Sequence, residues 1–278
     1  MKTVLIAGAS SGIGFEAAKL FLKNGWRVLA GARNQTRMQP LAELGAEIFP
    51  LDVCDAQSCK DAAARCDRID VLVNCAGYGQ YGPIECVKEE DAKRQMDTNV
   101  FGIVRMVQEV APIMRKQGSG RIINITSCGG MATTYLGGWY HMSKYAAESL
   151  CDALRMELKP FGIRVIAIEP GLVKTGWEAI TADHLERAGE GTVYEADCKT
   201  VAAVYRAAAS WDAVTKPETA AKKIYCAATA AHPKARYLFG FGGRALVAAR
   251  RLLSAGIYDA VMRKMFGLKV TKKLSGTA

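Results

Sequence analysis

The first two thirds of the chain alternate short, largely apolar runs with longer segments of helical periodicity. The short runs are Thr3–Ala7, Arg27–Gly31, Glu47–Leu51, Val71–Asn74, Arg121–Thr126 and Arg164–Glu169. The helical segments lie at about Gly12–Asn24, Asp55–Cys66, Glu90–Gln117 and Tyr140–Phe161. Apolar strands separated by helices indicate a parallel sheet covered on both faces. Because crossovers between parallel strands are right-handed, we expect a Rossmann-type, doubly wound α/β fold of about seven strands.

This alternation stops after Pro170. Residues 172–215 carry helical patterns but no strand, and a long excursion at the carboxyl end of a strand is typical of a substrate lid. A helix at about Pro217–Ala231 and a last strand at Arg236–Gly240 resume the pattern, and Gly243–Leu268 is helical again. We expect one domain over residues 1–278, with a lid at 172–215 and a basic extension at 243–278.

Composition narrows the class of protein. Half of the 278 residues are hydrophobic and 23% are charged, which excludes a disordered chain. No apolar run reaches the roughly 18–20 residues of a membrane span, and the apolar start is interpreted as a strand because it runs directly into glycines. Nine single cysteines without a C-x-x-C pair, and only three histidines, predict reduced thiols, a cytoplasmic protein and no metal site.

The net charge of +10 belongs to the C-terminal part of the chain. Residues 216–278 hold 13 Lys and Arg against 2 Asp and Glu, whereas residues 1–215 hold 24 against 25. The apolar residues of the last helical segment fall on one half of the helix: Ile257, Tyr258, Val261, Met262, Met265 and Phe266. This helix either lies on an anionic membrane surface or caps the protein or a partner subunit. Nucleic-acid binding is not expected, because no aromatic-interleaved basic surface accompanies it.

A glycine-rich turn follows the first strand. It reads Gly8-Ala9-Ser10-Ser11-Gly12-Ile13-Gly14 and opens a helix. Glycines there permit a tight turn and a close approach of backbone to phosphate, and the helix N-terminus offers free N–H groups to a pyrophosphate. The turn therefore predicts a dinucleotide site, with a plain glycine-rich turn as the alternative.

The end of the second strand bears on the choice of cofactor. A site for NAD carries an acid about 20 residues beyond the glycines, where it binds the ribose 2′-OH. The segment Val28–Thr36 contains no acid, Ala32 stands at that position and Arg33 follows. Arg33, with the hydroxyl of Ser11, suits a 2′-phosphate, so we expect NADP(H). The alternative is that Arg33 is a solvated loop charge.

Tyr140 and Lys144 are candidates for acid–base chemistry. They stand four residues apart on a helix and share a face. A tyrosine titrates near 10, and we expect the lysine cation and a positive nicotinamide to lower this pKa, so that Tyr140 exchanges a proton with the substrate oxygen. Ser127, at the end of a strand, is placed to stabilise charge on that oxygen. Taken singly, Tyr140 would be a core tyrosine and Ser127 a cap.

These motifs together resemble the short-chain dehydrogenase/reductase family. The residues that carry the resemblance, beside the glycine turn, are Asn74-Cys75-Ala76-Gly77, Asn99, Ser127 thirteen residues before Tyr140, Tyr140 to Lys144 as Y-x-x-x-K, and Pro170-Gly171-Leu172-Val173-Lys174-Thr175 as P-G-x-x-x-T. They cover residues 1–240 in family order, and the chain looks most similar to the hydroxysteroid and retinol dehydrogenase-like branch. Ala7, Cys75 and Met142 depart from the family pattern.

The resemblance implies roles for further residues. The catalytic set would be Tyr140, Lys144, Ser127 and Asn99, the last holding a water that feeds protons towards Lys144. The cofactor would contact Gly8, Ser10, Ser11, Gly12, Ile13, Gly14, Arg33, Asp52, Val53, Asn74, Ala76, Gly77, Tyr140, Lys144, Pro170, Gly171, Val173 and Thr175. Asp52 and Val53 would lie at the adenine, unless Asp52 is only a turn aspartate. A homodimer through the segments Glu90–Gln117 and Tyr140–Phe161 is also implied.

The expected substrate is a bulky, apolar, steroid-like ketone or secondary alcohol. The walls of the substrate site would be Tyr78, Gly79 and Tyr81, the segment Met131–Trp139 with Tyr135, and the lid from Trp177. The aromatic residues among these are equally explained as lid packing. Two other functions stay open: a non-catalytic dinucleotide sensor, and an epimerase or dehydratase relative, although the latter usually has a G-x-x-G-x-x-G spacing.

Overall fold

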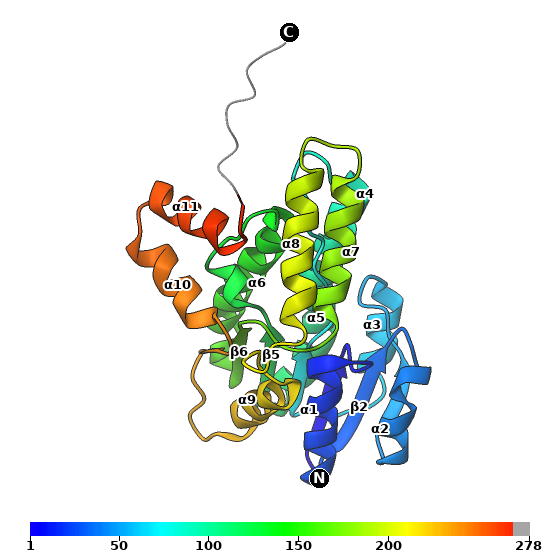
Figure 1. Cartoon of the computed structure of the whole chain (residues 1–278). Helices are drawn as coiled ribbons and strands as arrows, with labels where there is room; N and C mark the ends of the chain where they lie inside the picture. The colour runs from blue at the N-terminus through cyan, green and yellow to red at the C-terminus, as the bar shows by residue number, and fades with distance from the viewer. Residues whose placement is uncertain (269–278) are drawn as a thin grey trace.

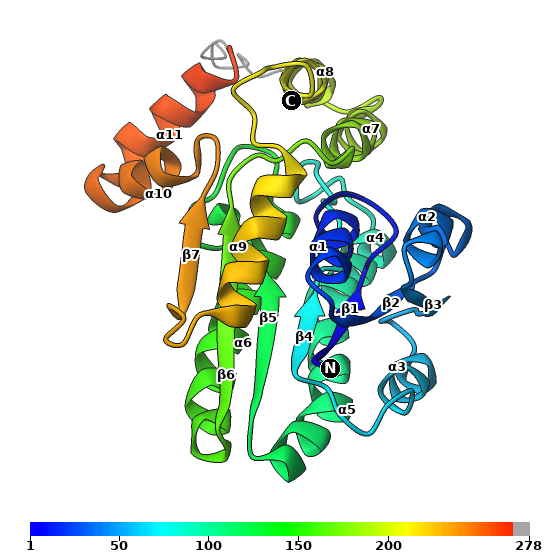
Figure 2. The ribbon, with the colours of Figure 1, turned by 90° about the horizontal axis from the view of Figure 1, so that it is seen from below.

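A seven-stranded parallel sheet forms the centre of the molecule. The computed structural model of the chain describes residues 1–268. Its strands are β1 (Thr3–Ala7), β2 (Arg27–Ala32), β3 (Glu47–Pro50), β4 (Val71–Asn74), β5 (Gly120–Ile125), β6 (Ile163–Pro170) and β7 (Arg236–Phe239). They lie in the order β3-β2-β1-β4-β5-β6-β7, and every neighbouring pair is parallel (Figure 2). The Rossmann-type prediction is confirmed, and the strand order reverses between β1 and β4.

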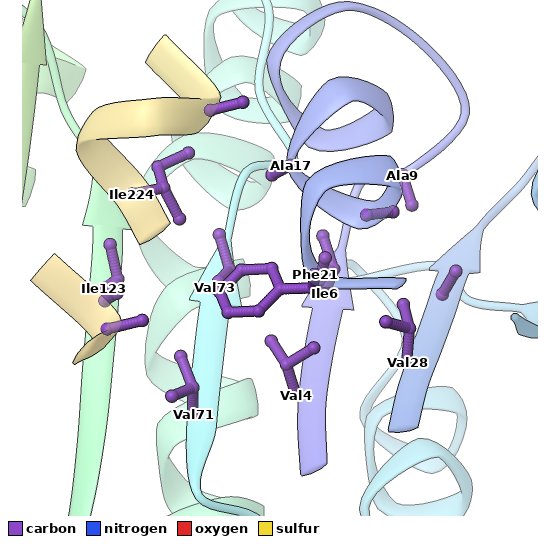
Figure 3. Packing of buried hydrophobic residues seen from close by; sticks show 14 of the residues in the cluster. Val4, Ile6, Ala9, Ala17, Phe21, Val28, Val71, Val73, Ile123 and Ile224 are labelled. Carbon is purple, nitrogen blue, oxygen red and sulfur yellow. The ribbon is translucent and has the colours of Figure 1, made fainter. Parts of the chain in front are cut away.

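Helices cover both faces of this sheet. One face carries α1 (Gly12–Lys23), α2 (Gln39–Glu43) and α9 (Pro217–Thr229), and the other carries α3 (Ala56–Ala63), α5 (Gly102–Gln117) and α6 (Gly138–Leu158). Alternate strand residues divide between the two cores: Val4 packs with Phe21 of α1 and Ile224 of α9, whereas Leu5 joins the opposite core (Figure 3). Burial on both faces explains why the strands are apolar throughout.

The predicted helix Glu90–Gln117 is interrupted. α4 (Glu89–Met96) leads into a π-helical turn, η2 (Asp97–Phe101), before α5 begins. A π turn contains one residue more than an α turn and frequently marks a functional site. Here it carries Asn99, which is buried. The short helices η1 (Thr36–Met38) and α2 were not predicted.

Two further helix pairs lie at the carboxyl ends of the strands. The predicted lid contains α7 (Trp177–Gly189) and α8 (Glu195–Ala208), and the extension contains α10 (Gly243–Leu252) and α11 (Ala255–Met265) (Figure 1). Residues 269–278 of the predicted extension lie outside the described residues. No helix within residues 1–268 is long and apolar enough to cross a membrane.

Arg236 fixes the edge strand β7 to its neighbours. Its Nη1 donates to Glu169 Oε1 at 2.8 Å and to the carboxylate of Glu148, and its Nη2 donates to Asp152 Oδ2 at 2.7 Å. Glu169 is the last residue but one of β6, and Glu148 and Asp152 are one turn apart on α6. One guanidinium therefore ties β7, β6 and α6 together directly behind the carboxyl end of the sheet.

Candidate active site

A single large cavity runs along the carboxyl ends of the strands, where open α/β sheets bind their ligands. Its volume is about 2290 Å³. The residues predicted from the sequence that line it are Gly8, Ser10, Ser11, Gly12, Ile13, Arg33, Asp52, Val53, Ala76, Gly77, Ser127, Tyr140, Lys144, Pro170, Gly171, Val173 and Thr175. Three predicted residues, Gly14, Asn74 and Asn99, lie behind its wall. The structure thus brings together residues from almost the whole length of the predicted motifs.

The glycine turn is shaped by close backbone contacts. A Cβ atom on Gly14 would lie 2.2 Å from the carbonyl oxygen of Gly8, and one on Gly12, whose φ is +55°, would lie 2.9 Å from the Thr175 Cβ. Gly14 therefore serves the packing of α1 against the turn rather than the cavity. Ser11 is the N-cap residue of α1, its side chain caps no backbone N–H group, and no acid lies in the first turn. The N-terminus of α1 is left open to an anion.

Asn74 departs from its expected role at the cofactor. Its Nδ2 donates to Asn124 Oδ1 at 2.8 Å, and both side chains are buried between β4 and β5. The pair joins the carboxyl ends of two strands beneath the cavity. Ala76 and Gly77, which follow, line the cavity directly, so Asn74 supports this wall without facing it.

The end of β2 forms a cationic rim of the cavity. Ala32, Arg33, Asn34 and Arg37 all line it, and no carboxylate stands among these four residues. Arg37 was missed because η1 was not predicted, although its spacing of four from Arg33 was a usable signal. Asp52 also lines the cavity, and its Oδ1 accepts a hydrogen bond from Cys54 N at 3.0 Å. Asp52 is therefore a turn aspartate that also borders the cavity.

Tyr140, Lys144 and Ser127 meet at the centre of the cavity. Lys144 Nζ lies 5.9 Å from the centroid of the Tyr140 ring and donates to the carbonyl of Ile125 at 3.0 Å, which ties α6 to the end of β5. Ser127 Oγ accepts from Gly129 N at 2.9 Å and donates to Pro170 O at 3.5 Å. All three side chains are buried, so little of their surface is in contact with bulk water.

Burial sets the protonation of this group. It raises the pKa of Tyr140 above the usual value for tyrosine, while the hydrogen bond with Ser127 acts in the opposite direction. Burial also lowers the pKa of Lys144 to about 8. The lowered pKa predicted for Tyr140 is therefore not found in the chain alone, because desolvation outweighs the hydrogen bond with Ser127. At neutral pH Tyr140 holds its proton and Lys144 is still mainly cationic, which is the state of a proton donor.

Asn99 acts on the backbone beside Lys144 rather than on Lys144 itself. Its Oδ1 accepts from Tyr78 N at 3.1 Å, and its Nδ2 donates to Tyr78 O at 3.0 Å and to Ser143 Oγ at 2.9 Å. Gly77 lies between the two: a Cβ there would stand 3.0 Å from Asn99 Oδ1 and 3.7 Å from Lys144 Nζ. The described contacts make Asn99 a positioning residue for the Gly77–Tyr78 wall.

His141 is a positioning residue that the sequence analysis missed. Thr134 N donates to its Nε2 at 2.9 Å, so the proton of the neutral ring is on Nδ1, which donates to Gly129 O at 2.9 Å. Burial lowers the pKa of His141 to about 4 and keeps it neutral. His141 follows Tyr140 directly in the chain. Its hydrogen bond with Thr134 therefore holds the predicted substrate segment Met131–Trp139 next to Tyr140.

Aromatic side chains enclose Tyr140 from the substrate side. Ring centroids lie 5.4 Å apart for Tyr81 and Tyr140 and 5.3 Å apart for Tyr140 and Trp177. Tyr205 of α8, which sequence reasoning missed, stacks against both Tyr81 and Trp177. These residues line the cavity and also pack on one another, so both interpretations of the aromatic residues hold. Tyr135 serves packing alone in the described structure, since its hydroxyl donates to Asp197 Oδ2 at 2.7 Å and it does not line the cavity.

The extension forms the remaining wall. Its lining residues are Ala245, Leu246 and Ala249 of α10 and Val261, Met262, Met265 and Phe266 at α11. Tyr258 donates to Thr133 O at 2.8 Å, and the Phe266 ring lies 6.0 Å from Tyr205. One of the two interpretations of this segment, a cap on the protein, therefore agrees with its contacts. Its lining of the cavity was not predicted.

Comparisons with known proteins decide the family of this chain. A family profile described as short chain dehydrogenase matches residues 2–185. The chain belongs to the short-chain dehydrogenase/reductase family. It is 34% identical over 263 residues to a probable short-chain type dehydrogenase/reductase, VdlC, of Helicobacter pylori, covering 93% of this chain and 96% of that protein.

Two further proteins that are similar to this chain bear on its chemistry. A 3-ketodihydrosphingosine reductase of Bacteroides thetaiotaomicron is 38% identical over 179 residues, covering 63% of this chain and 65% of that protein. The closed form of a serine dehydrogenase complexed with NADP⁺ superposes with a TM-score of 0.71 at 28% identity, covering 86% of this chain and 94% of that one. This chain is an NAD(P)-dependent oxidoreductase, which sets aside the epimerase and the non-catalytic interpretations.

Proposed function

We propose that this protein reduces a bulky, apolar ketone to a secondary alcohol with NADPH, and catalyses the reverse oxidation with NADP⁺. One observation carries the proposal. A single cavity has Tyr140, Ser127 and Lys144 at its centre, apolar and aromatic residues towards the lid, and Arg33 with Arg37 but no carboxylate at the end of β2. Such an arrangement accommodates an apolar carbonyl compound on one side and a phosphorylated dinucleotide on the other.

The cofactor side fits a dinucleotide on the residues present. Gly8 and Gly12 leave the turn without a Cβ atom at two positions where a pyrophosphate would approach, and the open N-terminus of α1 suits its charge. Arg33 and Arg37 would hold a 2′-phosphate, whose charge Ala32 does not oppose. When bound, the nicotinamide supplies or accepts the hydride.

The chain's own residues manage the proton and the substrate oxygen. Tyr140 donates its proton to the carbonyl oxygen as that oxygen gains charge, and takes it back in the oxidation direction. Ser127 donates a hydrogen bond to the same oxygen and stabilises the developing charge. The Lys144 cation, held by the Ile125 carbonyl, favours the phenolate that Tyr140 becomes. Asn99 and His141 hold the surrounding backbone in place.

The substrate class is supported by the lining and by one relative. Trp177, Ile180, Val204, Leu246 and Met262 give the lid side an apolar surface, which suits a steroid-like or lipid-like ketone better than a sugar. The relative from Bacteroides is named for the reduction of a keto lipid. A steroid-like substrate would also agree with the predicted likeness to the hydroxysteroid and retinol branch. Turnover of NADPH with steroid ketones, long-chain keto lipids and keto sugars tests this class, and turnover with keto sugars alone would refute it.

Cofactor preference is tested at the end of β2. We expect the wild type to prefer NADPH, and the double variant Ala32→Asp with Arg33→Ala to shift relative kcat/KM towards NADH by more than about a hundredfold. The new carboxylate would accept the ribose 2′-OH of NADH and repel a 2′-phosphate. A matched control is Arg65→Ala, which removes a cation that does not line the cavity. A wild type that prefers NADH would contradict the proposal.

Two copies of the chain are proposed to associate through α4, α5 and α6. Exposed apolar side chains on these helices or directly beside them in the chain, Phe101, Met156 and Phe161, support such a contact. Sedimentation velocity of the wild type and of Phe101→Ser with Met156→Ser checks it. A wild type that sediments as a monomer would rule it out.

A further inference from the structure

The apolar half of α11 is divided into two rows of side chains. Tyr258, Met262 and Phe266, spaced four apart, are buried against the rest of the molecule. The adjacent row, Ile257, Val261 and Met265, has the same spacing but remains exposed, with Ile257 at 55%. The capping contact therefore uses only half of the apolar surface that the sequence provides.

The neighbouring helix adds to this exposed row. Leu252, at the end of α10, is 82% exposed. The same two helices carry four exposed cations, Arg244, Arg250, Arg251 and Lys264, against Asp259 as the one acid within residues 243–268. We call the surface formed by Leu252, Ile257, Val261 and Met265 with these cations the α10–α11 surface. Large aliphatic side chains bordered by cations are typical of helices that lie in the interface of an anionic membrane.

The α10–α11 surface also borders the cavity. Val261 and Met265 belong to the exposed row and line the cavity that holds Tyr140. Figure 1 shows α10 and α11 projecting together beside the lid helix α8. An apolar compound dissolved in a bilayer would therefore reach the cavity along α11 without crossing water.

We propose that the α10–α11 surface seats this protein on the surface of an anionic lipid bilayer, with the row Ile257, Val261 and Met265 in contact with the acyl chains. A second copy of the chain is a poorer occupant, because two such surfaces would bring their cations together. An acidic protein could pair its carboxylates with these cations, but the aliphatic row projects from the surface and forms no groove in which a partner's side chains would bind. The negative surface potential of anionic lipids and their apolar interior match both features at once.

The test is co-sedimentation of the full chain with vesicles. We expect binding to phosphatidylcholine vesicles that contain phosphatidylserine, weak binding to phosphatidylcholine alone, and release at high salt. Leu252→Ser with Ile257→Ser should weaken binding more than about tenfold, because two aliphatic side chains no longer enter the lipid. Neither residue lines the cavity, so NADPH binding should be unchanged and reports that the variant is folded. Leu44→Ser with Val193→Ser is the matched control, since these side chains are 56% and 85% exposed elsewhere on the molecule.

Three outcomes would overturn the proposal. The first is the absence of binding to the anionic vesicles. The second is equal binding by the wild type and the Leu252, Ile257 variant. In the third, sedimentation velocity without lipid shows an oligomer for the wild type and for the control, but a monomer for the Leu252, Ile257 variant. This result would assign the surface to a second copy of the chain. Loss of vesicle binding in Arg244→Glu with Lys264→Glu would support the role of the cations.

Discussion

The two sides of the cavity are built by different means. On the cofactor side, backbone meets backbone: Gly14 lies against the Gly8 carbonyl, and Gly8 against the backbone of Ala76. On the substrate side, side chains from four separate segments meet, and Trp177, Tyr205 and Met262 come from three helices. Backbone contacts tolerate no change of residue type, whereas side-chain packing tolerates exchange of one apolar residue for another. The residues on the cofactor side are therefore constrained, whereas those on the substrate side can change and so alter which substrate is bound.

The largest effect is expected from removing the proton donor that lies between the cofactor side and the substrate side of the cavity. Tyr140→Phe keeps the ring in its aromatic surroundings and removes only the proton donor. We expect kcat to fall by at least about a hundredfold, the usual scale of general acid catalysis, with the NADPH Kd unchanged. Stopped-flow or steady-state turnover with the best ketone, and fluorescence titration of NADPH, measure the two quantities. Near-normal turnover would remove Tyr140 from its proposed role.

The next prediction strains the cofactor side. Gly12→Ala adds a Cβ 2.9 Å from the Thr175 side chain, and we expect the NADPH Kd to rise about tenfold or more as the turn shifts. Gly25→Ala is the control: it also places alanine at a positive φ, +72°, but in open space. It should lower the free energy of unfolding by about 1 kcal/mol and leave the NADPH Kd unchanged. Equal effects of the two variants on Kd would show that the Thr175 contact is irrelevant.

The third prediction changes the substrate side alone. Trp177→Leu removes the ring that contacts Tyr140 and Tyr81 but keeps an apolar side chain. We expect kcat/KM for different ketones to change unequally, by roughly three- to tenfold, because the shape of the pocket changes. The NADPH Kd should stay the same. A uniform loss over all ketones would instead indicate that Trp177 only supports Tyr140.

The smallest expected effect is on the thermal stability of the folded chain, through Glu169, which lies behind the site. Burial raises the pKa of Glu169 to about 7, above its value in an unfolded chain. The folded state therefore holds a proton that the unfolded state releases, and this contribution to stability is lost as the pH rises through about 7. Glu169→Gln resembles the protonated form, so its Tm relative to wild type should be higher at pH 8 than at pH 5. Thermal unfolding at both values measures this, and a difference that does not depend on pH would contradict the assignment.

The same contrast explains what the sequence could predict. The alternation of strands and helices, the glycine turn and the Tyr140–Lys144 pair were predicted because each depends on short spacings along the chain. Arg37 and α2 were missed, since five residues carry little periodicity. Asn74 was assigned to the cofactor because the family resemblance implied it, whereas its partner Asn124 lies on another strand. The part of the cavity lined by α10 and α11 was missed because folding, not spacing, brings it to Tyr140.

The π-helical turn at Asp97–Phe101 has a consequence for chain length. A π turn is an α-helix with one residue inserted, so deleting one residue there would restore regular α-helical spacing across α4 and α5. That deletion would rotate one helix by about 100° relative to the other. Asn99 would no longer reach the backbone of Gly77 and Tyr78, although α4 and α5 would keep their own backbone hydrogen bonds. A related chain that lacks this one residue would therefore lose the contact of Asn99 with the wall beside Lys144, and a one-residue gap at this point would mark such a chain.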